Sequence, residues 1–304
     1  MGSIRDISIV GAGAMGAFYA SRFFDMDGSS VSLIAGGKRY NRLKEEGLVV
    51  NGKCYNVPVV HPEQAASPAD LIIVAVKNHH LGDAIEDMQN RVGRETIILS
   101  VMNGIDSEEW IGAVFGMDKL LYSVAVGIDA LRDGKAVTYT TQGKLFFGEA
   151  DNRMLTDRVR RLQGLFSRAG IVYETPDDMI RVLWWKFMIN VGINQASAVL
   201  RAPYGVFQTS REAKDLMDSA MREVTAIAAA AQIDITDEDI DNWYGFLSQL
   251  SPEGKTSMLQ DVEARRKTEV EMFAGKMMEL GGRFGIATPV NETLYRIIRV
   301  IEQQ

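Results

Sequence analysis

A glycine-rich turn near the start of the chain constrains the fold more than any other stretch. Residues 7–10 read Ile-Ser-Ile-Val, a short apolar run typical of a buried strand, and residues 11–16 read Gly-Ala-Gly-Ala-Met-Gly. Apolar side chains then recur at helical spacing through residues 17–24. A strand, a GxGxxG turn and a helix in this order predict the first unit of an open, doubly wound parallel sheet that binds a dinucleotide.

The three glycines of this turn would each have a separate role. Gly11 permits the sharp turn, Gly13 lets the backbone approach a pyrophosphate, and Gly16 lets the helix pack closely on the strand. The pyrophosphate would lie on the N-terminus of the helix, where backbone N–H groups attract an anion. A glycine-rich turn without a ligand is the structural alternative. The predicted cofactor-binding residues of this turn are Gly11, Ala12, Gly13, Ala14, Met15 and Gly16.

The end of the second predicted strand, residues 31–34, bears on the choice of dinucleotide. Proteins that select NAD usually end this strand with a carboxylate that accepts from the ribose hydroxyls. Here residues 35–40 read Ala-Gly-Gly-Lys-Arg-Tyr, without a carboxylate and with two cations. Lys38 and Arg39 fit the 2′-phosphate of NADP, Arg39 with the better bidentate geometry. We therefore predict NADPH as the cofactor, the alternative being that both cations are solvated charges at the start of a helix.

Two further predicted strands end in polar residues. The apolar run at 70–76 ends at Lys77, and the run at 96–102 ends at Asn103 and Gly104. Ligands in open parallel sheets lie outside the carboxyl ends of the strands, so we expect Lys77 and Asn103 beside the cofactor or the substrate. The alternative is a turn at Asn103 and a surface charge at Lys77.

Antiparallel strands and then helices are predicted for the rest of the chain. Residues 48–60 form two extended runs around Asn51 and Gly52, a strong hairpin signal, and the alternation at 136–148 predicts antiparallel strands that extend the main sheet. Helical periodicity dominates after residue 174. We therefore predict a Rossmann-type α/β domain over 1–174 and a mostly α-helical domain over 175–304, with helices near 179–200, 211–231, 237–250, 258–284 and 291–301.

The first of these helices carries a sparse polar line on a largely apolar surface. Lys186, Asn190 and Asn194 are four residues apart, and each such step advances about 400°, so their side chains stay on one face of an α-helix. Burying an unpaired ammonium is costly. A core lysine paired with a carboxylate, and two amides that satisfy one another, are the structural alternatives to a functional site.

A second informative stretch begins at Ser257. Ser257 followed three residues later by Gln260 predicts a capping box, and a helix N-terminus with a hydroxyl group suits a substrate carboxylate. Glu269 would lie about three turns further along the same helix. On spacing alone, it is a solvated carboxylate.

Composition excludes several classes of protein. The formal charge of −7 argues against a nucleic-acid partner, and no apolar run reaches the roughly 20 residues of a membrane helix. The single cysteine, Cys54, allows no intrachain disulfide and favours a reducing, cytoplasmic location. The three histidines, His61, His79 and His80, lack the spacing of a ligand set, so no metal site is expected.

Taken together, these motifs resemble the ketopantoate reductase (2-dehydropantoate 2-reductase) family along nearly the whole chain. Each motif is weak alone, and their order and spacing carry the resemblance. They are the turn at 11–16, Val76 with Lys77, Asn103 with Gly104, Lys186 with Asn190 and Asn194, 257–261 with Thr268 and Glu269, and 285–291.

The resemblance implies that NADPH delivers hydride to the C2 ketone of a small branched 2-keto acid, 2-dehydropantoate in pantothenate biosynthesis. It also implies catalytic roles for Lys186, as general acid, and for Glu269, which would order the lysine, the substrate and the cofactor. By the same resemblance, Asn190, Asn194 and Ser257 bind the substrate, while Asn103 contacts both ligands. The expected protein is a monomer or homodimer that binds a small molecule.

One position departs from the family pattern. Where the family often offers another asparagine to the substrate, this chain has Tyr204. A phenol can replace the hydrogen bond of an amide, but it is bulkier. Tyr204 therefore bears on which 2-keto acid the pocket accepts and not on the reaction.

Two other functions remain open from the sequence. A 3-hydroxy acid dehydrogenase also pairs a Rossmann-type domain with a catalytic lysine. In those enzymes the segment before the lysine is rich in glycine, whereas residues 181–185 here read Arg-Val-Leu-Trp-Trp. A dinucleotide-binding sensor would keep the fold without the chemistry.

Overall fold

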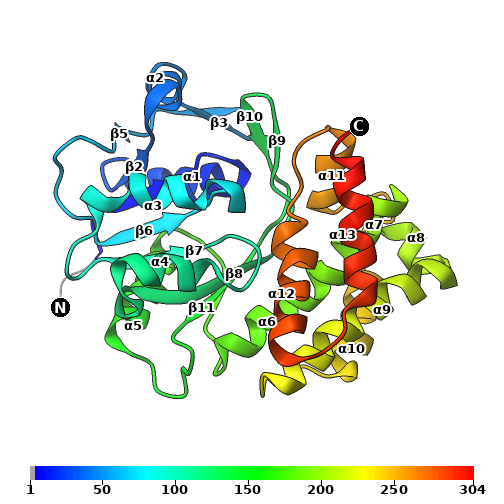
Figure 1. The fold of residues 1–304 in the computed structure, drawn as a ribbon. Helices are drawn as coiled ribbons and strands as arrows, with labels where there is room; N and C mark the ends of the chain where they lie inside the picture. The colour runs from blue at the N-terminus through cyan, green and yellow to red at the C-terminus, as the bar shows by residue number, and fades with distance from the viewer. Residues whose placement is uncertain (1–3) are drawn as a thin grey trace. The chain divides into compact units, whose positions relative to one another are not determined.

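The computed structural model of the chain describes residues 4–304 and divides them into two compact units, 4–182 and Leu183–Gln304. The first unit contains all of the named strands, and the second is helical (Figure 1). The division falls inside helix α6 (Met179–Ile189), shortly after the domain boundary expected between residues 174 and 175. The predicted class, a Rossmann-type α/β sheet followed by a mostly helical part, is confirmed.

The main sheet has eight strands in the order β12-β11-β8-β7-β6-β1-β2-β5. The chain moves outward from β1 to β2 and β5 and then returns to the other side of β1 with β6, which is the strand order of a doubly wound nucleotide-binding sheet. The strands from β5 to β8 pair in parallel, and β11 pairs antiparallel with β8. Their bounds are Ile7–Val10 (β1), Val31–Ile34 (β2), Val59–Val60 (β5), Leu71–Val74 (β6), Ile97–Ser100 (β7), Leu120–Ile128 (β8), Gln142–Gly148 (β11) and Tyr173–Glu174 (β12).

A second sheet of four strands has the order β4-β3-β10-β9, with bounds Lys53–Tyr55, Leu48–Val50, Ala136–Thr138 and Leu131–Asp133. The hairpin expected around Asn51 and Gly52 is confirmed as β3 and β4. The expectation that both strands of 136–148 extend the main sheet is wrong, because β10 pairs with β3 and only β11 extends it. Asp129 accepts the backbone N–H groups of Thr140 and Thr141, at 2.9 and 2.7 Å, where the chain passes from one sheet to the other.

Helices of the first unit support a dry sheet. Every residue of β1, β2, β6 and β7 is buried, as parallel strands covered on both faces are. Phe18 and Phe23 of α1 are almost fully buried in the same core. The helices are α1 (Ala14–Met26), α2 (Gly37–Glu46), α3 (Leu81–Asp87), α4 (Ser107–Phe115) and α5 (Asp157–Arg168).

The second unit is built from helices and two π-helical turns. The helices are the part of α6 from Leu183 onward, α7 (Gln195–Leu200), α8 (Tyr204–Thr209), α9 (Arg211–Ala230), α10 (Asp237–Leu247), α11 (Ser257–Glu263), α12 (Lys276–Phe284) and α13 (Pro289–Ile301). The π turns are η4 (Asn190–Asn194) and η5 (Glu271–Gly275). The helices expected near 211–231, 237–250 and 291–301 are therefore confirmed.

The single helix expected over 258–284 is wrong, because residues 264–270 leave the helical path. Arg265 adopts a left-handed conformation, with φ of 53°. Thr268 then donates through its backbone N and its hydroxyl to Glu302 Oε1, at 2.8 and 2.7 Å. These bonds reach a residue 34 positions away, so helical periodicity alone could not reveal the break.

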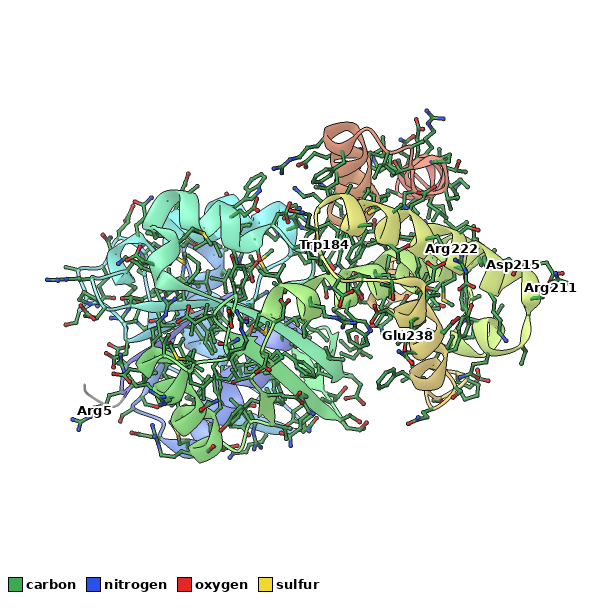
Figure 2. The ribbon with its side chains drawn as sticks, turned by 90° about the horizontal axis from the view of Figure 1, so that it is seen from below. Arg5, Trp184, Arg211, Asp215, Arg222 and Glu238 are labelled. Atoms are coloured by element: carbon green, nitrogen blue, oxygen red, sulfur yellow. The ribbon has the colours of Figure 1, made fainter. Side chains whose placement is uncertain are left out.

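Helix α9 packs against η4. Its buried side carries Met217, Met221 and Val224. Figure 2 labels Arg211, Asp215 and Arg222 on the same helix, and Arg211 and Asp215 lie 3.7 Å apart as an exposed ion pair.

Among residues 4–304, no helix combines the length and the apolarity needed to cross a membrane.

Candidate functional site

The glycine-rich turn has the geometry that a bound pyrophosphate requires. Gly11 has φ of +98°, and a Cβ atom there would lie 2.6 Å from the Ala75 carbonyl oxygen. A Cβ atom on Gly16 would lie 1.7 Å from the Gly11 carbonyl oxygen. At Gly13, by contrast, the nearest atom would be Ala75 O at 4.0 Å, so this face of the turn is open. Helix α1 begins at Ala14, directly behind that face. The residues of this turn therefore fit a dinucleotide.

Lys77 and Asn103 lie at one edge of the main sheet. Val74 is paired with Ser100 in the parallel ladder of β6 and β7, so each polar residue lies three positions beyond a paired residue. Both are partly buried. Strand β1 pairs with β6 on the other side, with Val10 opposite Val74, so the glycine turn leaves the sheet at the same edge. The first unit thus gathers the predicted cofactor residues where the strand order reverses.

Lys38 and Arg39 lie in the first turn of α2, and both are exposed. Arg39 is close enough to Asp87 for its charge to act on that carboxyl, whose pKa is raised by burial and lowered in part by Arg39. This placement suits a 2′-phosphate beyond β2, and it equally suits the solvated alternative.

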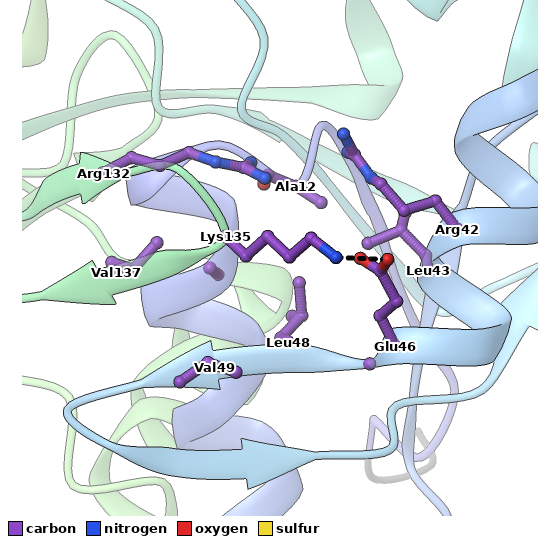
Figure 3. Close-up of a pocket in the computed structure, with 11 residues that line it drawn as sticks. Ala12, Arg42, Leu43, Glu46, Leu48, Val49, Arg132, Lys135 and Val137 are labelled. Carbon is purple, nitrogen blue, oxygen red and sulfur yellow. Dashed lines mark hydrogen bonds and ion pairs between the residues drawn. The ribbon is translucent and has the colours of Figure 1, made fainter.

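The structure adds two cations near the glycine turn, Arg42 and Arg132, that the sequence analysis missed. Arg132 donates to the Ala12 carbonyl oxygen and, at 3.1 Å, to that of Gly134. Burial, followed by the charge of Arg42, lowers the pKa of Arg132. Figure 3 shows both guanidinium groups beside Ala12 in a small pocket. Arg132 is 120 residues from Ala12 in the chain and reaches it only through the second sheet, so no local pattern could reveal the contact.

Glu46, a carboxylate that lines the same pocket, is paired with Lys135 and with neither arginine. Lys135 Nζ lies 2.5 Å from Glu46 Oε1, the dashed contact of Figure 3. Neither Arg42 nor Arg132 forms a salt bridge with any residue in the described range 4–304. Two like charges therefore face each other next to the proposed pyrophosphate turn.

Lys186 lies near the end of α6 among buried aromatic and aliphatic side chains. Trp184, Phe187 and Met188 are buried, and Lys186 itself is partly buried. This burial lowers the pKa of Lys186 to about 8, because a low-dielectric environment disfavours the ammonium form. Within residues 4–304, its Nζ makes neither a hydrogen bond nor a salt bridge. The alternative of a core lysine held by a carboxylate is therefore wrong for the described part of the chain.

The two asparagines of the polar line lie on a π turn, not on a continuous α-helix as expected. The chain changes from α6 to η4 at Asn190 and returns to an α-helix at Gln195. Asn194 Nδ2 lies 3.5 Å from Asn190 Oδ1, a long contact between two buried amides. Gly192 makes room for α9 here, since a Cβ atom on it would lie 2.5 Å from Met221 Cε. Single π turns within helices are frequent at functional sites.

The cap predicted at Ser257 is wrong by one residue. Thr256 is the N-cap of α11, and its hydroxyl accepts from the Leu259 N–H at 3.1 Å. The same hydroxyl lies 2.5 Å from Ser197 Oγ on α7. Thr256 is buried by this contact, while Ser257 becomes the first residue of the helix and is exposed. The hydroxyl of Ser257 is therefore not engaged in capping.

Glu269 lies in the irregular segment that leads into η5, not on a helix. It is partly buried, and η5 begins two residues later. The two π turns pack against each other, and the rings of Phe187 in α6 and Phe273 in η5 have centroids 6.5 Å apart. The second unit thus brings the elements carrying Lys186, Asn190, Asn194 and Glu269 together.

Tyr204 begins α8 and packs on a turn that precedes Thr256. Its backbone N–H donates to the Gly254 carbonyl oxygen at 2.9 Å. A Cβ atom on Gly254 would lie 2.9 Å from Tyr204 Cδ2, so the ring lies directly on this glycine. Burial raises the pKa of the Tyr204 phenol, which stays a neutral hydrogen-bonding group at neutral pH.

A doubly wound sheet with an open glycine turn, followed by a helical unit with an unpaired buried amine beside paired amides, defines the class of two-domain, nucleotide-dependent oxidoreductases. Within that class, the chain belongs to the ketopantoate reductase family. Residues 7–152 match the family described as ketopantoate reductase PanE/ApbA, and residues 178–302 match its C-terminal part.

Relatives span nearly the whole chain at low identity. The 2-dehydropantoate 2-reductase of Aquifex aeolicus is 26% identical over 302 residues, covering 97% of this chain and 96% of the relative. The 2-dehydropantoate 2-reductase structure from Geobacter metallireducens GS-15 is 27% identical, with a TM-score of 0.86 over 97% of this chain and 99% of the other. A ternary structure of D-mandelate dehydrogenase with NADH and anilino(oxo)acetate has a TM-score of 0.87 at 23% identity over 98% of each chain, a similarity of fold alone.

Proposed function

We propose that this protein is an NADPH-dependent reductase of a branched 2-keto acid, with 2-dehydropantoate as the first candidate substrate and pantoate as the product. Such a reaction would belong to pantothenate biosynthesis. The observation that carries the proposal is the Lys186 amine, which is buried without a carboxylate partner among residues 4–304 and lies one turn before a pair of amides. The names of the relatives support the choice of substrate.

Lys186 would serve as the proton donor. NADPH, when bound, supplies the hydride that adds to C2 of the keto acid. As the C2 oxygen gains negative charge, the Lys186 ammonium donates a proton to it, and the neutral amine later recovers a proton from water. A pKa of about 8 keeps most of the lysine protonated at pH 7 and makes it a stronger acid than an exposed lysine.

The other predicted residues would hold the reactants. The amides of Asn190 and Asn194 can donate to a carboxylate or carbonyl oxygen without adding a charge, and Ser257 offers an exposed hydroxyl. By family resemblance, we assign Asn103 to contacts with both ligands and Glu269 to the ordering of Lys186 and the cofactor. Lys77 and the 11–16 turn would bind the cofactor.

A substrate panel tests this function directly. We expect kcat/KM for the NADPH-dependent reduction of 2-dehydropantoate or another branched 2-keto acid to be at least tenfold higher than kcat/KM for a 2- or 3-hydroxy acid. The hydroxy acids to compare are D-mandelate and 3-hydroxyisobutyrate, each oxidised with NAD or NADP. Preferred oxidation of the 3-hydroxy acid would instead place the protein with the 3-hydroxy acid dehydrogenases. Tight NADPH binding without turnover of any substrate would identify a sensor and contradict the proposal.

Cofactor choice is tested by removing pairs of cations. We expect Lys38→Ala/Arg39→Ala to raise the Kd for NADPH by roughly 10- to 100-fold, because charge-assisted hydrogen bonds of about 1.5 to 3 kcal/mol are lost, and to leave the Kd for NADH nearly unchanged. Fluorescence titration measures both constants.

A second pair separates the two groups of cations. Arg42→Ala/Arg132→Ala removes the guanidinium groups beside Ala12, and Lys44→Ala removes a neighbouring exposed cation as a control. If the selective loss of NADPH affinity follows the arginine pair and not Lys38 and Arg39, the assignment of the 2′-phosphate is wrong. Equal affinity of the unmodified protein for NADPH and NADH would contradict the choice of NADPH itself.

A further inference from the structure

A series of hydrogen-bonded polar side chains, buried or partly buried, continues from the η4 turn. Gln195 follows the turn directly and is fully buried. Its Nε2 donates to the Val191 carbonyl oxygen, inside the turn, at 2.8 Å, and to Asn291 Oδ1 on α13 at 2.9 Å. One amide therefore links the π turn to a helix nearly 100 residues away in sequence.

Glu223 on α9 holds Asn291, the residue to which Gln195 is bonded. Its carboxylate accepts from Asn291 Nδ2 at 2.7 Å and from the backbone N–H groups of Val290 and Asn291 at 2.7 and 3.0 Å. These N–H groups belong to the first turn of α13, where a carboxylate is favoured by the helix dipole. The position of Asn291 is thus fixed from both its backbone and its side chain.

The Glu223 carboxylate also fixes which way the side-chain amides of Asn291 and Gln195 are oriented. A carboxylate can only accept, so Asn291 must turn its Nδ2 toward Glu223 and its Oδ1 toward Gln195. Gln195 must then present Nε2 to Asn291, and the same nitrogen reaches Val191 O. The remaining Gln195 Oε1 is buried and has no partner within residues 4–304, which costs free energy. With the amide turned over, Oε1 would instead face two other acceptors, Val191 O and Asn291 Oδ1, so the observed orientation is the better one.

Val191 lies between the two asparagines of the proposed substrate site. A π turn is a rare local conformation, so it needs support beyond the backbone hydrogen bonds of the helix. Gln195 bonds to Val191 O four residues earlier on the same helical path, and Asn291 on α13 holds the Gln195 amide from outside it. Gln195 bonds to the carbonyl oxygen of Val191, which lies within this turn. Val191 follows Asn190 directly and precedes Asn194 by three residues. A change in the turn would therefore rotate both amides, which at present lie 3.5 Å apart.

We propose that Gln195, Asn291 and Glu223 are positioning residues that hold the η4 turn and so aim the amides of Asn190 and Asn194 at the substrate. The inference rests on the proposed function for the identity of the substrate. The holding of the turn by Gln195 stands on the hydrogen bonds alone.

The test removes the donor to Val191 without changing the size of the side chain. Gln195→Met takes away both bonds of Nε2, and Gln195→Met/Asn291→Leu also removes the Oδ1 acceptor that the single variant leaves unpaired in the core. We expect both variants to lower kcat/KM for the 2-keto acid by roughly 10- to 100-fold, mainly through KM, the range seen when reacting groups are misplaced. The Kd for NADPH should stay within threefold of the unmodified protein.

A matched control separates positioning from general loss of stability. Gln208 Nε2 also donates to two backbone carbonyls, those of Leu247 and Leu250 at 2.8 and 2.9 Å, but lies away from η4 on α8. Gln208→Met should lower the melting temperature without raising KM. If it raises KM as much as Gln195→Met does, the effect is not specific and the proposal is overturned.

Amide hydrogen exchange provides a readout that needs no activity. Peptides covering residues 189–196 should exchange faster in Gln195→Met than in Gln208→Met, because the π turn loses its external support. Unchanged exchange in that segment would overturn the proposal, as would an unchanged KM. If the unmodified protein reduces no 2-keto acid, the proposed function fails, and exchange still decides whether Gln195 holds the turn. Should the single variant fail to fold, the double variant is measured in its place.

Discussion

Replacing Lys186 with alanine is expected to lower turnover of the 2-keto acid by roughly 10²- to 10⁴-fold, the contribution of a positioned general acid. Binding of NADPH should persist, because the predicted cofactor residues of the 11–16 turn are unchanged. Lys186→Arg should not restore activity, since a guanidinium group is larger and does not give up its proton near neutral pH. Single-turnover measurement of NADPH oxidation separates the chemical step from product release.

The pH profile identifies the amine as the group responsible. Because burial lowers the pKa of Lys186 to about 8, turnover should fall as the pH rises through about 8 and the ammonium is lost. For stability the sign is opposite. The unfolded chain binds this proton more tightly, so the cost of the buried ammonium is present below about pH 8 and disappears as the pH rises toward the value of an exposed lysine. Lys186→Met should accordingly raise the melting temperature at pH 7 while abolishing activity.

A surface lysine serves as the control. Lys255 forms an exposed ion pair with Glu263 at 2.8 Å, and such pairs contribute little. Lys255→Ala should leave turnover, its pH profile and the melting temperature nearly unchanged. Turnover of Lys186→Ala within threefold of the unmodified protein would remove this lysine from the mechanism.

Local signals in the sequence were sufficient for the glycine turn and the first strands of the main sheet. The strand at 7–10, the glycine turn and the strand at 31–34 match the structure because each is specified by residues adjacent in sequence. The contact of Arg132 with Ala12 was missed because it depends on the second sheet, whose strands come from two distant parts of the chain. The sequence could name the turn but not the cations that surround it.

The helical half was less predictable for a related reason. Four-residue spacing in Lys186, Asn190 and Asn194 is compatible with an α-helix, and nothing local indicates the π turn at 190–194 or the hydrogen bond from Gln195, just after it, to Asn291 on α13. Thr256 and Ser257 are both good caps, and the contact of Thr256 with Ser197 decides between them. In both cases a hydrogen bond from a distant segment overrides an adequate local pattern.

Substituting Gly16 with alanine is expected to destabilise the first unit by roughly 3 kcal/mol and to weaken NADPH binding at least 100-fold. The added Cβ atom would lie 1.7 Å from the Gly11 carbonyl oxygen, and this neighbour is backbone that cannot rotate away. Relief requires α1 to move from β1, which displaces the open face at Gly13 where the pyrophosphate would bind. Thermal unfolding and a fluorescence titration with NADPH measure the two effects.

Gly82 provides the matched control for this substitution. It lies in α3 of the same unit, and a Cβ atom there would meet nothing within 4 Å. Alanine at an open helical position reduces the freedom of the unfolded chain, so Gly82→Ala should stabilise the protein by about 0.5 to 1 kcal/mol without changing the Kd for NADPH. The same chemical change would then have opposite effects at two glycines. If Gly16→Ala instead behaves like Gly82→Ala, close packing at the turn is not what the cofactor requires, and the assignment of residues 11–16 to dinucleotide binding must be abandoned.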